Sequence, residues 1–269
     1  MPRKLLSSLS ALLLLLCVSL ACTRLSFRQE RPAPKDKGGL LLLIALKGGN
    51  QSEQTIASTI SIIERRCNQL AIYCKLQRQA GGQIELRVSS DMQPDRVKDV
   101  LLSQGLELRA VVSNPSPAPL ESYATEAEAK GVAGATRDVL PYSENDRGSQ
   151  APRRRFVVVE RKPIVTGEQV RDARATQARV RDDYEIIFSL NPEGAYQLQS
   201  WTRTHINNYL AIVLNGEARS VAYIKSEISD SGVITGHYTK EQAEDIAHVL
   251  VTGNLPAPVE VIKEGTYAP

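Results

Sequence analysis

The chain has 269 residues, of which 42% are hydrophobic and 23% are charged; these values are typical of a globular protein and exclude a wholly disordered chain. Its 33 basic and 30 acidic side chains are well mixed and give a formal net charge of +3, which excludes a broad basic surface for nucleic acid. The basic run at 153–155 is interpreted as a solvated loop edge.

The segment 1–22 predicts a signal peptide or a membrane anchor, because Arg3 and Lys4 precede an apolar stretch over 5–21. Residues 19–22 are similar to a bacterial lipoprotein cleavage site, with Cys22 as the lipid attachment residue, although Ser19 stands where such sites usually have leucine. An uncleaved helix and plain secretion are the alternatives, since the stretch approaches the roughly 20 residues of a spanning helix. We expect the folded part to lie in the periplasm of a bacterial cell envelope.

The next segment, 23–39, is interpreted as a tether, because it contains prolines and charges without an apolar period. A strand is expected at 40–46, followed by a helix for which Asn50 and Glu53 form a capping box. The helix carries an apolar stripe at helical spacing. Its members are Ile56, Ile60, Ile63, Cys67 and Leu70.

Strands at 75–79 and 83–88 flank two glycines and predict a hairpin. A second helix over 94–102 and a strand over 106–112 complete the order strand, helix, strand, strand, helix, strand. This order is the ferredoxin-like, or split βαβ, arrangement. We assign it to a base lobe at 40–113.

The segment 114–152 has five prolines and is interpreted as an inserted connector with a short helix near 125–130. A strand at 156–160 and a short helix containing Val170 and Ala173 are expected next. A strand at 184–190 precedes a helix that Asn191 caps.

Strands at 210–214 and 218–224 are joined by Asn215-Gly216, a strong hairpin signal. Thr239 and Gln242 cap the last helix, and a strand at 259–263 follows. The second half repeats the strand and helix order of the first. The expected fold is therefore α+β, with two lobes of ferredoxin-like, antiparallel-rich sheets.

The chain shows no nucleotide-binding loop, zinc-type pairing or nucleophile elbow. His205, His237 and His248 have no acid or cysteine at ligand spacing and are interpreted as structural. We therefore expect no catalytic, cofactor-binding or metal-binding residues, and no enzyme activity.

Cys67 and Cys74 lie close enough in the sequence to form a disulfide in an oxidising compartment. The alternative is that Cys67 fills the apolar stripe of its helix as a small hydrophobic residue while Cys74 stays unpaired.

Several stretches of the sequence resemble segments of one protein family, and they occur in the same order as in that family. They are 38–39 (GG), 64–66 with Asn68, 172–175 (DARA), 188–195 (FSLNPEGA), 207–216 (NNYLAIVLNG), 228–230 (ISD), 234–236 (ITG), 239–245 (TKEQAED) and 255–259 (LPAPV). The family that they resemble is SecD, and the part is its first periplasmic domain. SecD is the membrane-embedded partner of SecF in protein export, where it uses the proton gradient.

The resemblance implies a base lobe and a head lobe at 153–256, with 257–269 as a closing strand and tail. It also implies partners: a translocating unfolded polypeptide, and SecF or other translocon subunits. The transmembrane helices that follow this domain in SecD are missing from the sequence, so we expect a module without the proton path. Ala222, where the family usually has proline, and the charged run 35–37 also depart from the family pattern.

The sequence thus predicts an accessory or preprotein-holding module of protein export across the inner membrane, tethered to the membrane through its N-terminus. An envelope scaffold that keeps the fold and binds another envelope component is the alternative, and an enzyme is a third hypothesis. The strand at 218–224 is the candidate polypeptide-binding edge, because Arg219, Val221 and Tyr223 alternate along it.

Overall fold

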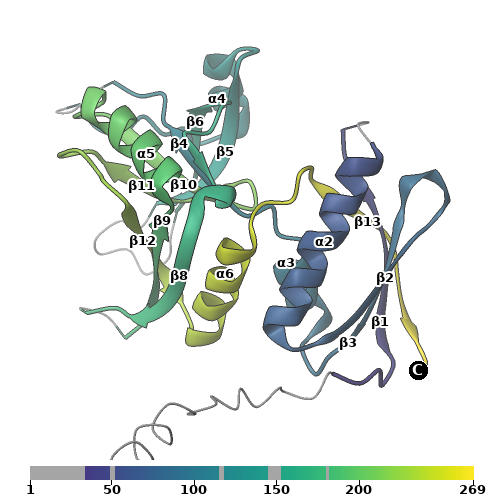
Figure 1. Cartoon of the computed structure of the whole chain (residues 1–269). Coiled ribbons are helices and arrows are strands. Elements are labelled where there is room, and N and C mark those ends of the chain that lie inside the picture. Colours follow the sequence, from purple (N-terminus) through teal and green to yellow (C-terminus); the bar gives the residue numbers. More distant parts are fainter. Residues whose placement is uncertain (1–33, 49–51, 115–117, 145–152, 180–181) are drawn as a thin grey trace, which may run out of the picture. The chain divides into compact units, whose positions relative to one another are not determined.

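The computed structural model describes residues 34–48, 52–114, 118–144, 153–179 and 182–269 (Figure 1). These residues form an α+β fold with three sheets and five α-helices. In the described part of the chain, no helix is both long enough and apolar enough to cross a membrane. The expectations for the segment 1–22, the lipid on Cys22 and the cap at Asn50 fall outside the described residues.

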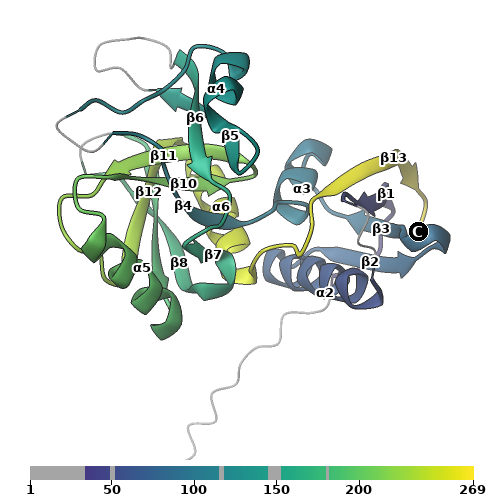
Figure 2. The same cartoon turned by 90° about the horizontal axis from the view of Figure 1, so that it is seen from above.

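The first sheet has four antiparallel strands in the order β13-β1-β3-β2, and we call this sheet with helices α2 and α3 the base lobe. Figures 1 and 2 show both helices on one face of the sheet. The apolar side chains of the helices and of that face form one core, which includes Leu42, Ile63 and Leu86. The elements are β1 (Gly39–Leu46), α2 (Glu53–Leu70), β2 (Tyr73–Arg78), β3 (Ile84–Ser89), α3 (Pro94–Leu101) and β13 (Val259–Tyr267).

The base sheet has the strand order of the expected ferredoxin-like unit, but its fourth strand is not the predicted one. Strand β13, from the end of the chain, pairs with β1, whereas β4 (Leu106–Ala110) joins another sheet. The base is therefore built from both ends of the folded chain. The chain leaves and re-enters the base at adjacent points, where the Leu255 amide donates to the Gln104 carbonyl at 3.3 Å.

Helix α2 begins one residue after its cap, Ser52, whose hydroxyl accepts from the Thr55 amide. Glu53 is the first helical residue and so does not occupy the capping-box position that was predicted for it. Three of the predicted stripe residues, Ile56, Ile63 and Cys67, are fully buried. The helix ends at Ala71, which has a left-handed φ of 54°.

The remaining elements form what we call the head lobe. A six-stranded sheet has the order β6-β5-β11-β10-β4-β7, and a three-stranded antiparallel sheet has the order β12-β9-β8. The elements are α4 (Glu126–Ala133), β5 (Arg137–Glu144), β6 (Arg153–Glu160), β7 (Val165–Thr166), β8 (Val170–Gln177), β9 (Tyr184–Leu190), α5 (Pro192–Thr204), β10 (Tyr209–Leu214), β11 (Glu217–Tyr223), β12 (Ser231–Tyr238) and α6 (Lys240–Thr252).

The head departs from the sequence prediction in several elements. The expected connector contains the short helix predicted near 125–130, which is α4, but it also contains strand β5, which was not predicted and pairs along its length with β6. The expected helix around Val170 and Ala173 is strand β8, and β12 was not predicted. The head therefore does not repeat the strand order of the base.

Helix α6 joins the cores of the two lobes. Its N-terminus carries the predicted capping box between Thr239 and Gln242. One face, with Ala243 and Leu250, packs into the head core, and the helix also contacts α2 and α3 of the base.

Candidate functional site

Strand β11 lies between β10 and β5 in the head sheet and so is not the terminal strand that the sequence suggested. It pairs along its whole length with β10, but within the described residues its pairing with β5 is a single position, Ala218 with Tyr142. Beyond Ala218, β11 runs past the described end of β5, and we call this outer side of β11 the seam.

The backbone of β11 directs alternate residues toward this seam. The Ile224 amide donates to the Asn208 carbonyl on the β10 side, so Ala222 and Ser220 also face β10. By the same alternation, the N–H and C=O groups of Val221 and Tyr223 face the seam. Two of the three predicted edge residues thus present main-chain groups on the outer side of the strand.

The three predicted edge residues do not share one face. A β-bulge opposite Ile212 places an extra residue in β11 and interrupts the alternation. Val221 packs with Ala211 in the core beneath β5 and β6, whereas Arg219 lines a cavity on the side of α6. The Tyr223 hydroxyl donates to the Asn207 side chain at 2.6 Å, which fixes the far end of the strand.

A cavity of about 530 Å³ lies beside the β10–β11 hairpin, with lining residues also from α3 and α6. Asn215 and Gly216 make the tight turn of this hairpin, with φ values of 53° and 73° that favour these two residues. The Asn215 side chain accepts from the Ser103 hydroxyl at 2.6 Å and from the Gln104 amide at 3.0 Å. The hairpin is thereby fixed to the segment that leaves the base.

Arg96 of α3 connects the base to α6 across the rim of the cavity. Its guanidinium donates two hydrogen bonds to the Asp245 carboxylate, at 2.7 and 2.9 Å, and a further one to Glu241. The hydrogen bonds to Asp245 raise the pKa of Arg96, and burial opposes them.

Arg66 lies in the interior, where only 1% of its surface is exposed, and donates to groups at the ends of two helices. At the end of α3 it bonds the carbonyls of Leu101 and Ser103, at 2.8 and 2.7 Å. At the end of α6 it bonds the Gly253 carbonyl and the Thr252 hydroxyl, at 2.9 and 3.1 Å. The partial negative charge of a helix C-terminus favours a cation at this place. Burial, followed by repulsion from Arg65, lowers the pKa of Arg66 to about 10, so the side chain is still charged at neutral pH.

Asn254 fixes the returning segment to the head. Its side chain donates to the Leu106 carbonyl at 3.0 Å and accepts from the Gly167 amide at 3.1 Å. A Cβ atom at Gly105 or Gly167 would lie within about 2.2 Å of the Asn254 side-chain oxygen, so neither position has room for a side chain.

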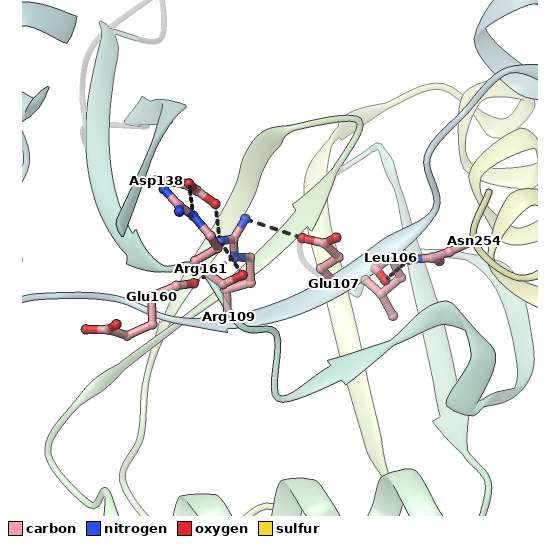
Figure 3. A network of polar contacts seen from close by, with 7 residues as sticks. All are labelled: Leu106, Glu107, Arg109, Asp138, Glu160, Arg161 and Asn254. Carbon is pink, nitrogen blue, oxygen red and sulfur yellow. Dashed lines mark hydrogen bonds and ion pairs between the residues drawn. The ribbon is translucent and has the colours of Figure 1, made fainter. Parts of the chain in front are cut away.

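A polar network around Arg109 holds the β5–β6 hairpin against β4 (Figure 3). Arg109 is 6% exposed and donates to the Asp138 carboxylate at 2.5 Å and to the carbonyls of Glu160 and Arg161 at 2.9 and 2.8 Å. Burial opposes ionisation of Asp138, but hydrogen bonds from Arg109 and Arg161 outweigh it and lower the Asp138 pKa. This network links the beginning of β5 and the end of β6 to β4.

Cys67 and Cys74 are joined by a disulfide that links the last turn of α2 to strand β2. The bond spans seven positions in the sequence and crosses the left-handed residue Ala71.

The three histidines occupy separate places. His205 stacks on Trp201, with ring centroids 4.1 Å apart, and His237 lies 3.4 Å from an Asp183 oxygen. His248 is in α6, where its carbonyl accepts from Thr252. Among the described residues, no group of three His, Cys, Asp or Glu side chains could hold a metal ion.

Sequence patterns alone do not reveal the roles of Arg66, Arg96, Arg109 and Asn254. A signal existed for Arg66, which lies three residues after Ile63 on the apolar stripe, where a charged residue needs buried partners. Arg109 likewise lies within the predicted apolar strand 106–112. Arg96 and Asn254 carry no comparable signal, because their partners lie far away in the sequence.

Comparison with known proteins identifies the family that this architecture resembles. Residues 140–257 match the family model "SecDF, P1 head subdomain". The chain is 33% identical over 224 residues to protein translocase subunit SecD of Koribacter versatilis, and 28% identical over 219 residues to SecD of Aquifex aeolicus. Each alignment covers 81% of this chain and 40% of the relative, so the chain spans about two fifths of their length.

Solved structures share the fold. The crystal structure of SecDF in its super-membrane-facing form superposes with a TM-score of 0.62 at 24% identity, over 96% of this chain and 35% of that one. A second structure, of a membrane component SecDF that enhances protein export, gives a TM-score of 0.59 at 24% identity, over 83% of this chain and 98% of that one.

Proposed function

Because the chain is homologous to the periplasmic domain of SecD, we propose that it acts in Sec-dependent protein export as an accessory module that holds an unfolded preprotein. The family is an accessory component of a translocase and is not a family of catalytic enzymes. The proposed place of action is the periplasmic face of the inner membrane. The proposed partners are the emerging polypeptide and translocon subunits such as SecF.

The observation that carries this proposal is the outer side of β11 past Ala218, the seam, where the described residues of β5 make no further pairs with it. An extended chain of almost any sequence can add to a strand through main-chain hydrogen bonds. The outward N–H and C=O groups of Val221 and Tyr223 are suited to this mode of binding. Such binding needs no energy input and depends little on side chains, as a preprotein-holding module requires.

The test is the binding of a reduced, unfolded, fluorescently labelled model protein to the full chain, measured by fluorescence anisotropy. Val221→Pro removes an outward N–H without removing a hydrogen bond to β10, so we expect affinity to fall about fivefold to tenfold. Val221→Thr keeps the N–H and the β-branched shape and is the matched control, which should bind as the wild type does. Thermal unfolding of both variants checks that they fold.

Equal binding by the wild type and Val221→Pro would contradict the seam as the binding site. If even the wild type failed to bind at high micromolar concentration, the chain would be better explained as an envelope scaffold that keeps the fold and binds another component.

We further propose that a lipid on Cys22 attaches the chain to the membrane. Cys22→Ala should then leave an uncleaved precursor or release soluble protein, because the thiol is the attachment point. Mass spectrometry of the mature N-terminus measures this directly. A membrane-bound product that retains Met1 would instead support an uncleaved helical anchor.

A further inference from the structure

The cavity beside the β10–β11 hairpin lies wholly within the compact unit Pro34–Pro269. Its volume of about 530 Å³ falls in the range of ligand-binding pockets. The main-chain groups of Val221 and Tyr223 that face the seam do not line this cavity. It adjoins β11 through Arg219, so a chain that lies along that strand passes its rim.

The inner surface of the cavity is mainly apolar. Val100, Leu214 and Val249 line it and are each at most 5% exposed, and we call them its floor. Ser103 is equally buried there, but its hydroxyl is already bonded to Asn215. Tyr238 adds an aromatic ring to the wall. This surface suits an alkyl chain, and an aromatic face also attracts cations.

The rim carries an excess of negative charge. Arg96 faces two carboxylates, Asp245 and Glu241, which together outweigh its single positive charge. Arg219 lies 3.2 Å from Glu217, which balances it. Asp99 also lines the cavity, and none of the ion pairs found among the described residues involves it. An apolar floor below an acidic rim is complementary to an alkyl chain that ends in a positive charge.

We propose that this cavity receives the side chain of a lysine or arginine from a polypeptide bound to the head. The methylene groups of such a side chain lie on the floor, and its cationic end reaches the carboxylates of the rim. The inference rests on the proposed function, because it takes the ligand to be a polypeptide. Main-chain hydrogen bonds do not select among sequences, so the cavity adds a preference for basic side chains to this binding mode.

The test compares three labelled peptides that share one uncharged, extended sequence and differ at a central lysine, norleucine or glutamate. Binding to the full chain is measured by fluorescence anisotropy at low and high salt. We expect the lysine peptide to bind most tightly and the glutamate peptide most weakly, with a difference that shrinks as salt screens the rim.

The variant Asp99→Asn should weaken binding of the lysine peptide about twofold to fivefold, as expected for one partly exposed ion pair, and leave the norleucine peptide unchanged. The matched control is Asp95→Asn on the same helix. The Asp95 side chain is 92% exposed and lies outside the cavity, so this variant should behave as the wild type does.

Binding of the unfolded model protein, measured in parallel, separates this inference from the proposed function. If that protein binds in a manner sensitive to Val221→Pro but the three peptides bind equally, the basic-side-chain cavity is overturned and the holding function stands. If Asp99→Asn abolishes a lysine preference while Val221→Pro has no effect, the cavity stands and the seam fails. If neither the protein nor any peptide binds, both proposals are overturned.

Discussion

Arg66 illustrates how one residue can connect two lobes. Burying a charged side chain without partners is very unfavourable, yet Arg66 is buried and its hydrogen-bond acceptors are four main-chain carbonyls and a hydroxyl at two helix ends. One helix belongs to the base and the other packs into the head. The contact between the lobes therefore depends on a guanidinium that donates in several directions at once.

We expect Arg66→Met to lower the free energy of unfolding by about 3 kcal/mol, because it leaves buried carbonyls without donors. Arg65→Met is the control, since Arg65 is exposed on the same turn and should change stability by less than about 0.5 kcal/mol. Urea unfolding followed by circular dichroism measures both. Similar small losses in the two variants would contradict the assigned role of Arg66.

Asp138 makes the stability of the head depend on pH. Its folded-state pKa lies below the ordinary value of 3.8, so its charged form is stabilised by folding. That stabilisation is complete above the ordinary value and is lost as pH falls through the lower folded-state pKa. We expect Asp138→Asn to be less stable than the wild type at neutral pH, and the difference to disappear in acid.

Urea unfolding of both proteins across this pH range tests the prediction, with Asp91→Asn as the control because Asp91 is exposed. A difference between wild type and Asp138→Asn that stays constant into strong acid would show that charge on Asp138 is not the cause.

At the scale of single elements, local signals in the sequence found most helices and hairpins. The caps at Asn191 and Thr239 and the Asn215-Gly216 turn act through neighbouring residues, so the sequence contains the whole interaction. Strand β8 was mistaken for a helix because its alanines, arginines and glutamine favour helix, and pairing with β9 overrides that preference. Strand β12 was missed because glycines interrupt it. Gly232 is required there, since a Cβ atom would lie 2.5 Å from the Phe188 ring.

Because a disulfide joins α2 to β2, we expect the stability of the protein to depend on the redox state of Cys67 and Cys74. A disulfide across seven positions is expected to contribute about 2.5 kcal/mol by restricting the unfolded chain. Cys74→Ala should therefore unfold at lower urea concentration than the oxidised wild type. Adding a reductant should lower the stability of the wild type to nearly that of the variant, and leave the variant unchanged.

Thiol labelling of denatured, unreduced protein from the periplasm reports the state of the two cysteines independently. Two free thiols in that sample would contradict the disulfide in the cell, and Cys67 would then be an ordinary core residue.

At the scale of the molecule, the head is an insertion between helix α3 and strand β13 of the base. Nothing local in the sequence predicts this, because 106–112 and 259–263 are both plausible fourth strands. Which of the two strands joins the base sheet depends on pairing between distant segments, and β4 pairs with β10 of the head. The candidate site was predictable only in part for the same reason. The residues of strand β11 are contiguous in the sequence, but the cavity beside the strand combines residues that lie far apart in the sequence.

The insertion makes a direct prediction. Joining 34–104 to 255–269 through a short glycine and serine linker should give a base lobe that folds alone, because Gln104 and Leu255 are already hydrogen-bonded neighbours. We expect a cooperative urea transition and dispersed amide signals in its NMR spectrum. The matched control is 34–113 without the C-terminal strand, which should not fold cooperatively. Cooperative folding of that control would show that β13 is dispensable.

The late position of β13 in the chain has a consequence for folding during synthesis. Strand β1 carries the run Leu40–Leu46, and the edge on which β13 pairs stays uncovered until residues 259–267 have emerged, after the whole head. An aliphatic strand with an open edge is prone to pair with other chains. The head elements emerge in the interval and can fold first. The base is then completed only by residues 259–267, which follow the head, so a ribosome that stalls before these residues emerge would leave a folded head attached to an aggregation-prone base.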